Sequence, residues 1–271
     1  MSRGAGIGAQ RDGSYSQSLE RGLSILSSFR SSRPLLGVSD LSREVGLNRS
    51  TTHRYVATLA SLGYLQQDQA TRKYRLGPRV LDLGFSAINS MELREVSLPH
   101  LRQLSDETGH TVNLAVLDGT DVVYLERCRS SRDGQREIDL DLHVGSRLPA
   151  YCTSLGKVLL AHLPPERLRA VLDGVRLTPR GPNTIVSRKA LVAELARVRE
   201  DRLAVNNEEL AYGLRSIAAP VRSASGDVVA AINLAVHRSM VSVDDLTARL
   251  GPPLCRTAEE ISARIGFGPA Q

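Results

Sequence analysis

Residues 38–62 carry the pattern that most constrains how this chain of 271 residues can fold. Leu41 and Val45 are four residues apart, which is the spacing of neighbours on one face of a helix. Gly46 tolerates the left-handed backbone that ends many helices, so a tight turn is expected there. The polar residues that follow predict a second helix. The stretch therefore indicates a helix-turn-helix.

Each of these helices begins with a residue that can cap it. Ser39 is suited to cap the first helix and Asn48 the second, because a short polar side chain can accept a hydrogen bond from a free backbone N–H. The second helix is expected to end near Leu62. Its buried stripe is expected to consist of Tyr55, Val56, Leu59 and Leu62. The side chains expected to lie away from this stripe are Arg49, Ser50, Thr51, His53 and Arg54.

The segments on both sides complete a winged helix-turn-helix. Residues 18–29 predict a helix that packs under the motif. The apolar positions expected to form its buried face are Leu19, Leu23, Leu26 and Phe29. Residues 63–66 and 73–76 are predicted to pair as a β-hairpin with a polar turn between them. This hairpin would be the wing, with Arg72 and Lys73 placed to touch phosphate.

The positive charge of the chain is concentrated in the same region. Residues 1–77 contain 11 Lys and Arg against 5 Asp and Glu, and their net charge of +6 equals that of the whole chain. A basic segment joined to a neutral remainder is typical of a module that binds a polyanion. The second helix of a helix-turn-helix can enter the major groove of double-stranded DNA. The residues expected to contact DNA are Ser39, Arg49, Ser50, Thr51, Thr52, Arg54, Arg72 and Lys73.

Length and composition fit two domains and no membrane span. No apolar run approaches the roughly 18 residues that cross a bilayer. Residues 1–14 are rich in Gly, lack the apolar core of a signal peptide and are expected to be a disordered tail. The cysteines Cys128, Cys152 and Cys255 show no metal-binding spacing, so reduced thiols, no metal and a cytoplasmic protein are expected.

The chain beyond residue 77 follows a different pattern. Residues 78–90 predict a linker helix whose apolar surface would pack against a second subunit. Residues 91–266 predict an α+β domain with an antiparallel sheet flanked by helices. Helices are expected at 92–108, 153–162, 189–200 and 243–265, with another that opens at Pro164-Pro165. Strands are expected at 111–117, 122–127, 137–142, 204–206, 216–221 and 228–236, with a loop at 144–150.

Taken together, these motifs resemble the IclR family of bacterial transcription regulators over residues 15–265. The segments that carry the resemblance are SLERGLSIL at 18–26, the helix-turn-helix, YRLG at 74–77, LPAYCTSLGK at 148–157 and NEELAYGLRSIA at 207–218. The resemblance implies a winged helix-turn-helix at 15–77, the linker helix, and a GAF-like effector-binding domain at 91–266. It implies a sequence-specific regulator without a cofactor, which a small organic acid controls. Such a regulator would bind a near-palindromic operator as a homodimer or homotetramer.

The resemblance also carries over an effector site, position by position. Family members that bind a small keto acid use a helix N-terminus, an acidic residue, a cysteine and two serines on the last strand. The matching positions here are Thr153, Ser154 and Leu155 at the helix, Asn206, Ser216, and Asn233 with Ala235. Asn206 stands where those members have a carboxylate, and Leu155 and Ala235 would add an apolar wall. Both differences favour a hydroxylated or aromatic acid over glyoxylate or pyruvate. Residues 144–154 are most like the branch that controls protocatechuate, 4-hydroxybenzoate and β-ketoadipate catabolism.

Four other interpretations remain open from the sequence. The regulator could serve another pathway, with a non-aromatic carboxylate as effector. Cys152 precedes a predicted helix, where a thiol pKa can fall, so an enzyme with a cysteine nucleophile is one alternative. A redox sensor that uses Cys152 and Cys128 is another. A purely architectural DNA binder is the last, although it leaves the large neutral domain without a role.

Overall fold

The computed structural model describes residues 15–30, 32–81, 92–129 and 142–267. The chain divides into two compact units, residues 1–87 and residues 88–271. Three predicted segments fall outside the described residues: the tail at 1–14, residues 82–90 of the linker helix, and residues 137–141 of one strand. None of the described helices is long and apolar enough to cross a membrane.

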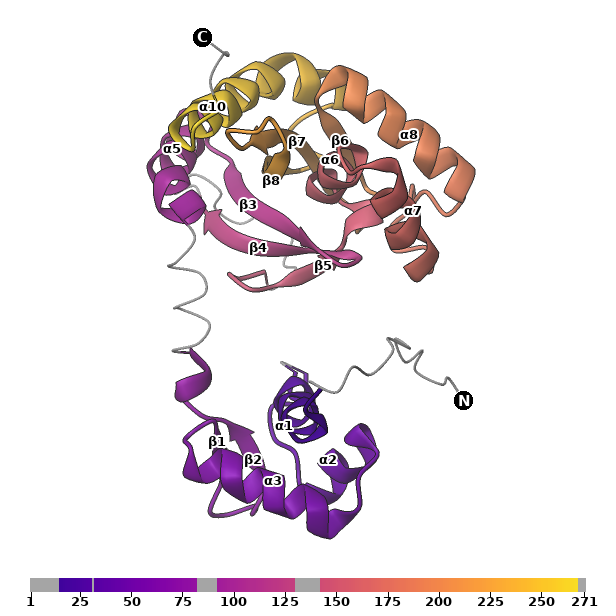
Figure 1. The fold of residues 1–271 in the computed structure, drawn as a ribbon. Coiled ribbons are helices and arrows are strands. Elements are labelled where there is room, and N and C mark those ends of the chain that lie inside the picture. The colour runs from indigo at the N-terminus through magenta and orange to yellow at the C-terminus, as the bar shows by residue number, and fades with distance from the viewer. Residues whose placement is uncertain (1–14, 31, 82–91, 130–141, 268–271) are drawn as a thin grey trace. The chain divides into compact units, whose positions relative to one another are not determined.

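The first unit is a winged helix-turn-helix (Figure 1). Its elements are α1 (Gln17–Ser27), α2 (Val38–Val45), α3 (Arg49–Ser61), β1 (Leu65–Gln67) and β2 (Tyr74–Leu76). The two strands pair antiparallel, with Leu65 opposite Leu76. Its core consists of Ile25, Leu36, Leu41, Val56, Leu65 and Tyr74. The order of elements agrees with the prediction, and each of the three helices contributes at least one side chain to this core.

Helix α1 buries a different face from the predicted one. Ile25 is fully buried, whereas Leu19 and Leu23 are 64% and 54% exposed. Leu26 and Phe29 pack against the core but are only partly buried. The apolar spacing was compatible with two faces of the helix, and contact with α2 and α3 selects the one centred on Ile25. The predicted stripe is therefore wrong for Leu19 and Leu23.

The helix boundaries of the motif are set by caps and by the turn. The N-cap of α2 is Gly37 rather than Ser39, and the Gly37 N–H donates to Oδ2 of Asp40 at 3.1 Å. Gly46 ends the helix with a φ of 66°, the left-handed conformation that glycine adopts without strain. Asn48 caps α3 as predicted. Leu62 lies past the end of α3 and is 47% exposed, so it is not part of the buried stripe.

The second unit is built on a six-stranded sheet with the order β5-β4-β3-β8-β7-β6. Every pair of neighbouring strands is antiparallel. The strands are β3 (Thr111–Asp118), β4 (Asp121–Cys128), β5 (Arg147–Pro149), β6 (Ala204–Asn207), β7 (Leu214–Arg222) and β8 (Val228–His237). Strand β5 lies within a segment that was predicted to be a loop, because Leu148 pairs with Val122 at the edge of the sheet.

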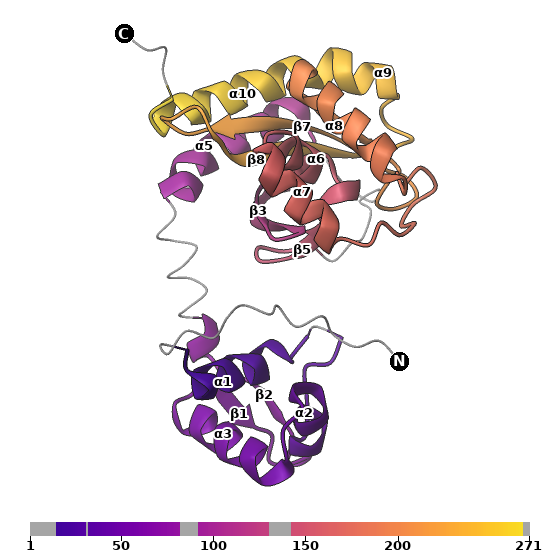
Figure 2. The same cartoon turned by 45° about the vertical axis from the view of Figure 1, so that its right-hand side comes forward.

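Helices cover both faces of this sheet (Figure 2). One face packs against α5 (Glu92–Thr108) and α10 (Gly251–Arg264), through side chains such as Leu114, Ile217 and Ile232. The other face packs against α6 (Ser154–Ala161), through Ala115, Ala218 and Ala231. Helices α7 (Pro165–Gly174) and α8 (Arg188–Asp201) continue this second layer. Successive residues of a strand point to opposite faces of the sheet. A polar residue on the same side of a strand as these alanines therefore also faces α6.

The C-terminal helical region is continuous but changes its winding. Helix α9 (Val243–Asp245) leads into a π-helical turn (Leu246–Leu250) and then into α10. Pro252 and Pro253 open α10 and have no backbone N–H to donate to the preceding turn. This accounts for the break within the helix that the sequence predicted at 243–265.

Candidate DNA-binding surface and effector site

The N-terminal end of α3 presents polar and basic side chains to solvent. Asn48 accepts hydrogen bonds through Oδ1 from the Thr51 backbone N–H at 2.8 Å and from the Ser50 hydroxyl at 2.9 Å. These bonds fix the first turn of the helix. Arg49 and Arg54 are exposed on the same helix. The helix therefore presents two guanidinium groups on a rigid element, an arrangement suited to phosphates and to base edges.

One of the predicted DNA contacts is buried. The Thr52 side chain is fully shielded from solvent, and its hydroxyl donates to the Asn48 carbonyl at 2.9 Å. Thr52 falls on the same side of α3 as Val56, four residues later, and both belong to the buried face. The Thr52 side chain is thus part of the core, and we withdraw it from the candidate contacts. Thr51 is half-buried, while Ser39 on α2 is exposed.

The turn of the β1–β2 hairpin holds the two basic residues predicted for the wing. Asp68 accepts hydrogen bonds through Oδ1 from the Thr71 N–H at 2.8 Å and from the Thr71 hydroxyl at 2.7 Å. These bonds lower the pKa of the Asp68 carboxyl, with the Thr71 side chain as the first cause. Arg72 follows with a φ of 58°, and both Arg72 and Lys73 are exposed. The wing is a defined turn whose basic side chains are accessible.

The predicted effector site begins at the N-terminus of α6. Thr153 is the N-cap, and its hydroxyl accepts from the Gly156 N–H at 3.0 Å. Gly156 lies directly against the preceding turn, because a Cβ there would stand 2.1 Å from the Ala150 carbonyl oxygen. Glycine is therefore required for α6 to approach this turn. The approach sets Ser154 and Leu155, both fully buried, against the sheet.

Four of the predicted or neighbouring polar residues form one buried network. The Ser154 hydroxyl lies 2.7 Å from the Ser216 hydroxyl, and Nδ2 of Asn233 donates to Ser154 at 3.4 Å. Nδ2 of Asn113 donates to Oδ1 of Asn233 at 2.8 Å. Arg127 then donates through Nη1 to Oδ1 of Asn113 at 3.4 Å. The network is neutral at its centre and reaches a guanidinium at its edge.

Asn206, predicted to contact the effector, hydrogen-bonds to backbone groups on both sides of its amide. Nδ2 of Asn206 donates to the Cys152 carbonyl at 2.6 Å, and its Oδ1 accepts from the Glu209 N–H at 3.1 Å. Both ends of the amide therefore bind backbone groups of the fold. This clamps the turn before α6 to the segment after β6. Asn206 still pairs with Ser216 in the sheet register, and Ser216 pairs with Ala235.

A buried ionic cluster supports the same helix. Nζ of Lys157 donates to Glu209 at 2.6 Å and to Glu194 at 3.0 Å, and it also donates to the Val205 carbonyl. Lys157 is only 1% exposed. Burial raises the pKa of the Glu209 carboxyl, and the charge of Lys157 opposes that shift. The cluster ties α6 to α8 and to the segment after β6.

Two residues of this site escaped the sequence analysis although a signal was present. Asn113 occupies an inward position between the apolar neighbours of β3, and a polar residue at such a position needs a partner. Lys157 is the only charged residue of a helix that is mostly apolar and fully buried, so a buried charge could have been inferred. Their partners come from distant segments, which the pattern of one helix or strand does not reveal.

The cysteines show no sign of activation. Cys152 is fully buried, and burial raises the pKa of its thiol to about 12. Burial likewise raises the pKa of the Cys128 thiol to about 11. A reactive cysteine needs a lowered pKa and access to solvent. The environment of these two thiols therefore disfavours the nucleophile and redox alternatives. Among the described residues, no group of His, Cys, Asp and Glu side chains is arranged to hold a metal ion.

Comparison with family models assigns both units. The model described as "IclR helix-turn-helix domain" matches residues 18–69. The model described as "Bacterial transcriptional regulator IclR C-terminal" matches residues 85–263.

Full-length relatives agree with these matches. The chain is 36% identical to the Pca regulon regulatory protein of Pseudomonas putida, over 95% of this chain and 86% of the relative. It is 33% identical to the p-hydroxybenzoate hydroxylase transcriptional activator of Acinetobacter baylyi, over 91% of each.

Solved structures show the same fold. A transcriptional regulator from Rhodococcus has a TM-score of 0.79 and 40% identity, with coverage of 93% of this chain and 98% of that one. An IclR homologue from Microbacterium hydrocarbonoxydans, solved in complex with 4-hydroxybenzoate, has a TM-score of 0.78 and 28% identity, with coverage of 92% and 99%. The chain belongs to the IclR family: it is a DNA-binding transcriptional regulator with an effector-binding domain, and not an enzyme.

Proposed function

We propose that DNA binding by this regulator is controlled by an aromatic acid or its catabolite, bound beside the N-terminus of α6. The observation that carries the proposal is the buried network of Ser154, Ser216, Asn233 and Asn113. Hydroxyl and amide groups can exchange their mutual hydrogen bonds for bonds to a carboxylate or a ring hydroxyl. Arg127 at the edge of the network would supply the positive charge.

The apolar surroundings suit a ring rather than a two- or three-carbon keto acid. Leu155 is fully buried next to Ser154, and the half-buried Ala235 lies beside Ser216 in the sheet. Two of the similar proteins described above give further support. One is named as an activator of p-hydroxybenzoate hydroxylase transcription, and the other was solved in complex with 4-hydroxybenzoate. Membership of the protocatechuate and 4-hydroxybenzoate branch is part of this proposal.

The proposed DNA contacts are Ser39, Arg49, Ser50, Thr51, Arg54, Arg72 and Lys73. Of these, Arg49 and Arg54 on α3 would read base edges, while Arg72 and Lys73 on the wing would bind phosphate. The exposed Leu19 and Leu23 on α1 fit a protein whose subunits associate, so we propose a homodimer or homotetramer. A two-fold symmetric assembly would select a near-palindromic operator.

Calorimetric titration of the whole chain tests the effector. The panel is protocatechuate, 4-hydroxybenzoate and β-ketoadipate, with glyoxylate and pyruvate for comparison. One aromatic acid is expected to bind, and Ser216→Ala should weaken it about tenfold by removing a buried hydrogen-bond partner. Ser225→Ala, on an exposed turn, is the matched control. Binding of glyoxylate or pyruvate alone would refute the aromatic assignment. Equal binding by the Ser216 variant and the parent would refute the location.

A further inference from the structure

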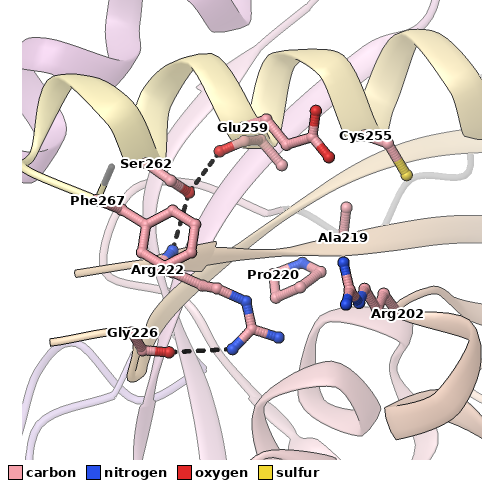
Figure 3. A pocket seen from close by; sticks show the side chains of 10 residues that line it. Arg202, Ala219, Pro220, Arg222, Gly226, Cys255, Glu259, Ser262 and Phe267 are labelled. Carbon is pink, nitrogen blue, oxygen red and sulfur yellow. Dashed lines mark hydrogen bonds between the residues drawn. The ribbon is translucent and has the colours of Figure 1, made fainter. Parts of the chain in front are cut away.

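A cavity of about 340 Å³ lies between helix α10 and the C-terminal half of β7 (Figure 3). Two arginines line it: Arg202, which follows α8, and Arg222, the last residue of β7. The buried side chain of Ala219 belongs to the sheet face that packs against α10. Ser154 and Ser216 belong to the polar network on the opposite face, below α6. The cavity is therefore separate from the proposed effector site.

The Arg222 side chain is held in place on one side of this cavity. Its Nη1 donates to the Gly226 carbonyl at 3.0 Å, and its backbone N–H donates to the Ser262 hydroxyl at 2.9 Å. Figure 3 shows the guanidinium groups of Arg202 and Arg222 on either side of Pro220, below α10. A guanidinium anchored in this way needs little reordering to accept a ligand.

Neither guanidinium has an acidic partner within ion-pair distance among the described residues. The pKa of Arg222 is lowered, first by burial and then by repulsion from Arg202. Both causes disfavour the cation. An anion between the two guanidinium groups would offset their mutual repulsion. It would also replace the hydrogen bonds to water that Arg222 loses through burial.

The positive charge extends beyond these two arginines. Burial is the first cause that lowers the pKa of the His162 ring, and a hydrogen bond to the Val158 carbonyl opposes it. Repulsion from Arg222, Arg199 and Arg202 lowers the pKa further. Three arginines therefore act on one half-buried ring, whose shielded Nε2 has no hydrogen-bond partner among the described residues. This region of the second unit has a local excess of positive charge.

The remaining lining determines what kind of anion fits. Glu259 on α10 also lines the cavity, so its three charged side chains together carry one net positive charge. A monoanion would neutralise them. Pro220 and Phe267 provide an apolar wall, and Figure 3 shows the ring of Phe267 beside Ser262 and Arg222.

We propose that this cavity is a second ligand site, which binds a small organic monoanion. Its carboxylate group lies between Arg202 and Arg222, and its apolar part lies against Pro220 and Phe267. The site is independent of the proposed effector and of its location below α6.

Equilibrium dialysis of the whole chain with radiolabelled butyrate and with radiolabelled inorganic phosphate tests this site. Arg222→Gln and Arg202→Asn are each expected to weaken butyrate binding about tenfold or more, because each removes a charge-assisted hydrogen bond. Arg202 has a φ of 56° and is exposed, and asparagine tolerates that backbone. The second variant therefore decides the question if Arg222→Gln does not fold.

Two control variants locate the binding. Arg169→Gln removes an exposed positive charge from α7, and Ser154→Ala alters the network below α6. Arg169→Gln should bind butyrate as the parent does, whereas Ser154→Ala, which lies in the proposed effector site, detects any butyrate that binds there instead. Loss of binding with Ser154→Ala but not with the arginine variants would overturn the proposal, as would the absence of butyrate binding. Binding of phosphate alone would overturn the assignment to an organic anion.

Discussion

Replacement of Lys157 by methionine tests whether the buried ionic cluster holds α6 in place. Lys157 is 1% exposed and its ammonium donates to two carboxylates, of which Glu209 is 8% and Glu194 13% exposed by side chain. Methionine fills much of the same volume but removes the ammonium group from both carboxylates. Breaking a buried ion pair by removing one partner costs about 3–5 kcal/mol. We expect a loss of about 3 kcal/mol, because Glu194 retains its bond to Arg197.

The loss should depend on pH in a defined direction. Burial already raises the pKa of Glu209, and Lys157 limits that rise. Without Lys157 the folded pKa rises further above the unfolded value. A group with a raised folded pKa stabilises the fold at low pH, and that stability is lost as pH rises through the folded pKa. The difference in free energy of unfolding between parent and variant should therefore be larger at pH 8 than at pH 5.

Urea denaturation followed by far-ultraviolet circular dichroism measures these differences. The matched control is Lys189→Met, an exposed lysine on α8, which should change the free energy of unfolding by less than about 0.5 kcal/mol. The double variant Lys157→Met with Glu209→Gln should regain part of the loss, because no carboxylate then remains at position 209. A loss below about 1 kcal/mol for Lys157→Met, or a difference that grows toward pH 5, would refute the reasoning.

Four further changes have expected outcomes. Arg49→Ala should cost about 1–3 kcal/mol of affinity for the specific operator in gel shifts and relax its base preference, whereas unchanged affinity would exclude this arginine as a contact. Lys73→Ala should weaken binding to all DNA sequences about equally and reduce the salt slope measured by fluorescence anisotropy. Gly156→Ala should lower the free energy of unfolding by about 1–3 kcal/mol in urea titrations, since its Cβ would meet the Ala150 carbonyl. Burial lowers the pKa of His162 from 6.5, so the unfolded chain binds more protons below that pH, and His162→Gln should reduce the loss of thermal stability between pH 7 and pH 5.

The sequence predicts the DNA-binding unit well where local signals determine structure. Asn48 caps α3 and Gly46 ends α2 because each effect depends on neighbouring backbone groups. The burial of Thr52 was missed, since its place depends on how α3 packs rather than on its polarity. Similarly, α1 offers two apolar faces, and only its packing selects Ile25.

Three of the residues predicted for the effector site lie together in the fold, but the sequence did not predict the hydrogen bonds that they form. Ser154, Ser216 and Asn233 do meet in one network. Asn206, by contrast, clamps the backbone of Cys152 and Glu209, and this role depends on a contact across more than fifty residues. A family resemblance indicates which positions correspond. A side chain that differs from the family's at such a position can form different hydrogen bonds.

A gel shift on the DNA upstream of the protein's own gene and of its neighbours tests the central claim most directly. The protein is titrated with and without protocatechuate, 4-hydroxybenzoate and β-ketoadipate, with glyoxylate and pyruvate for comparison. We expect a specific shift that one aromatic acid or its catabolite alters, and that Arg49→Ala weakens. A specific shift that responds to none of these compounds, or only to glyoxylate or pyruvate, would contradict the claim.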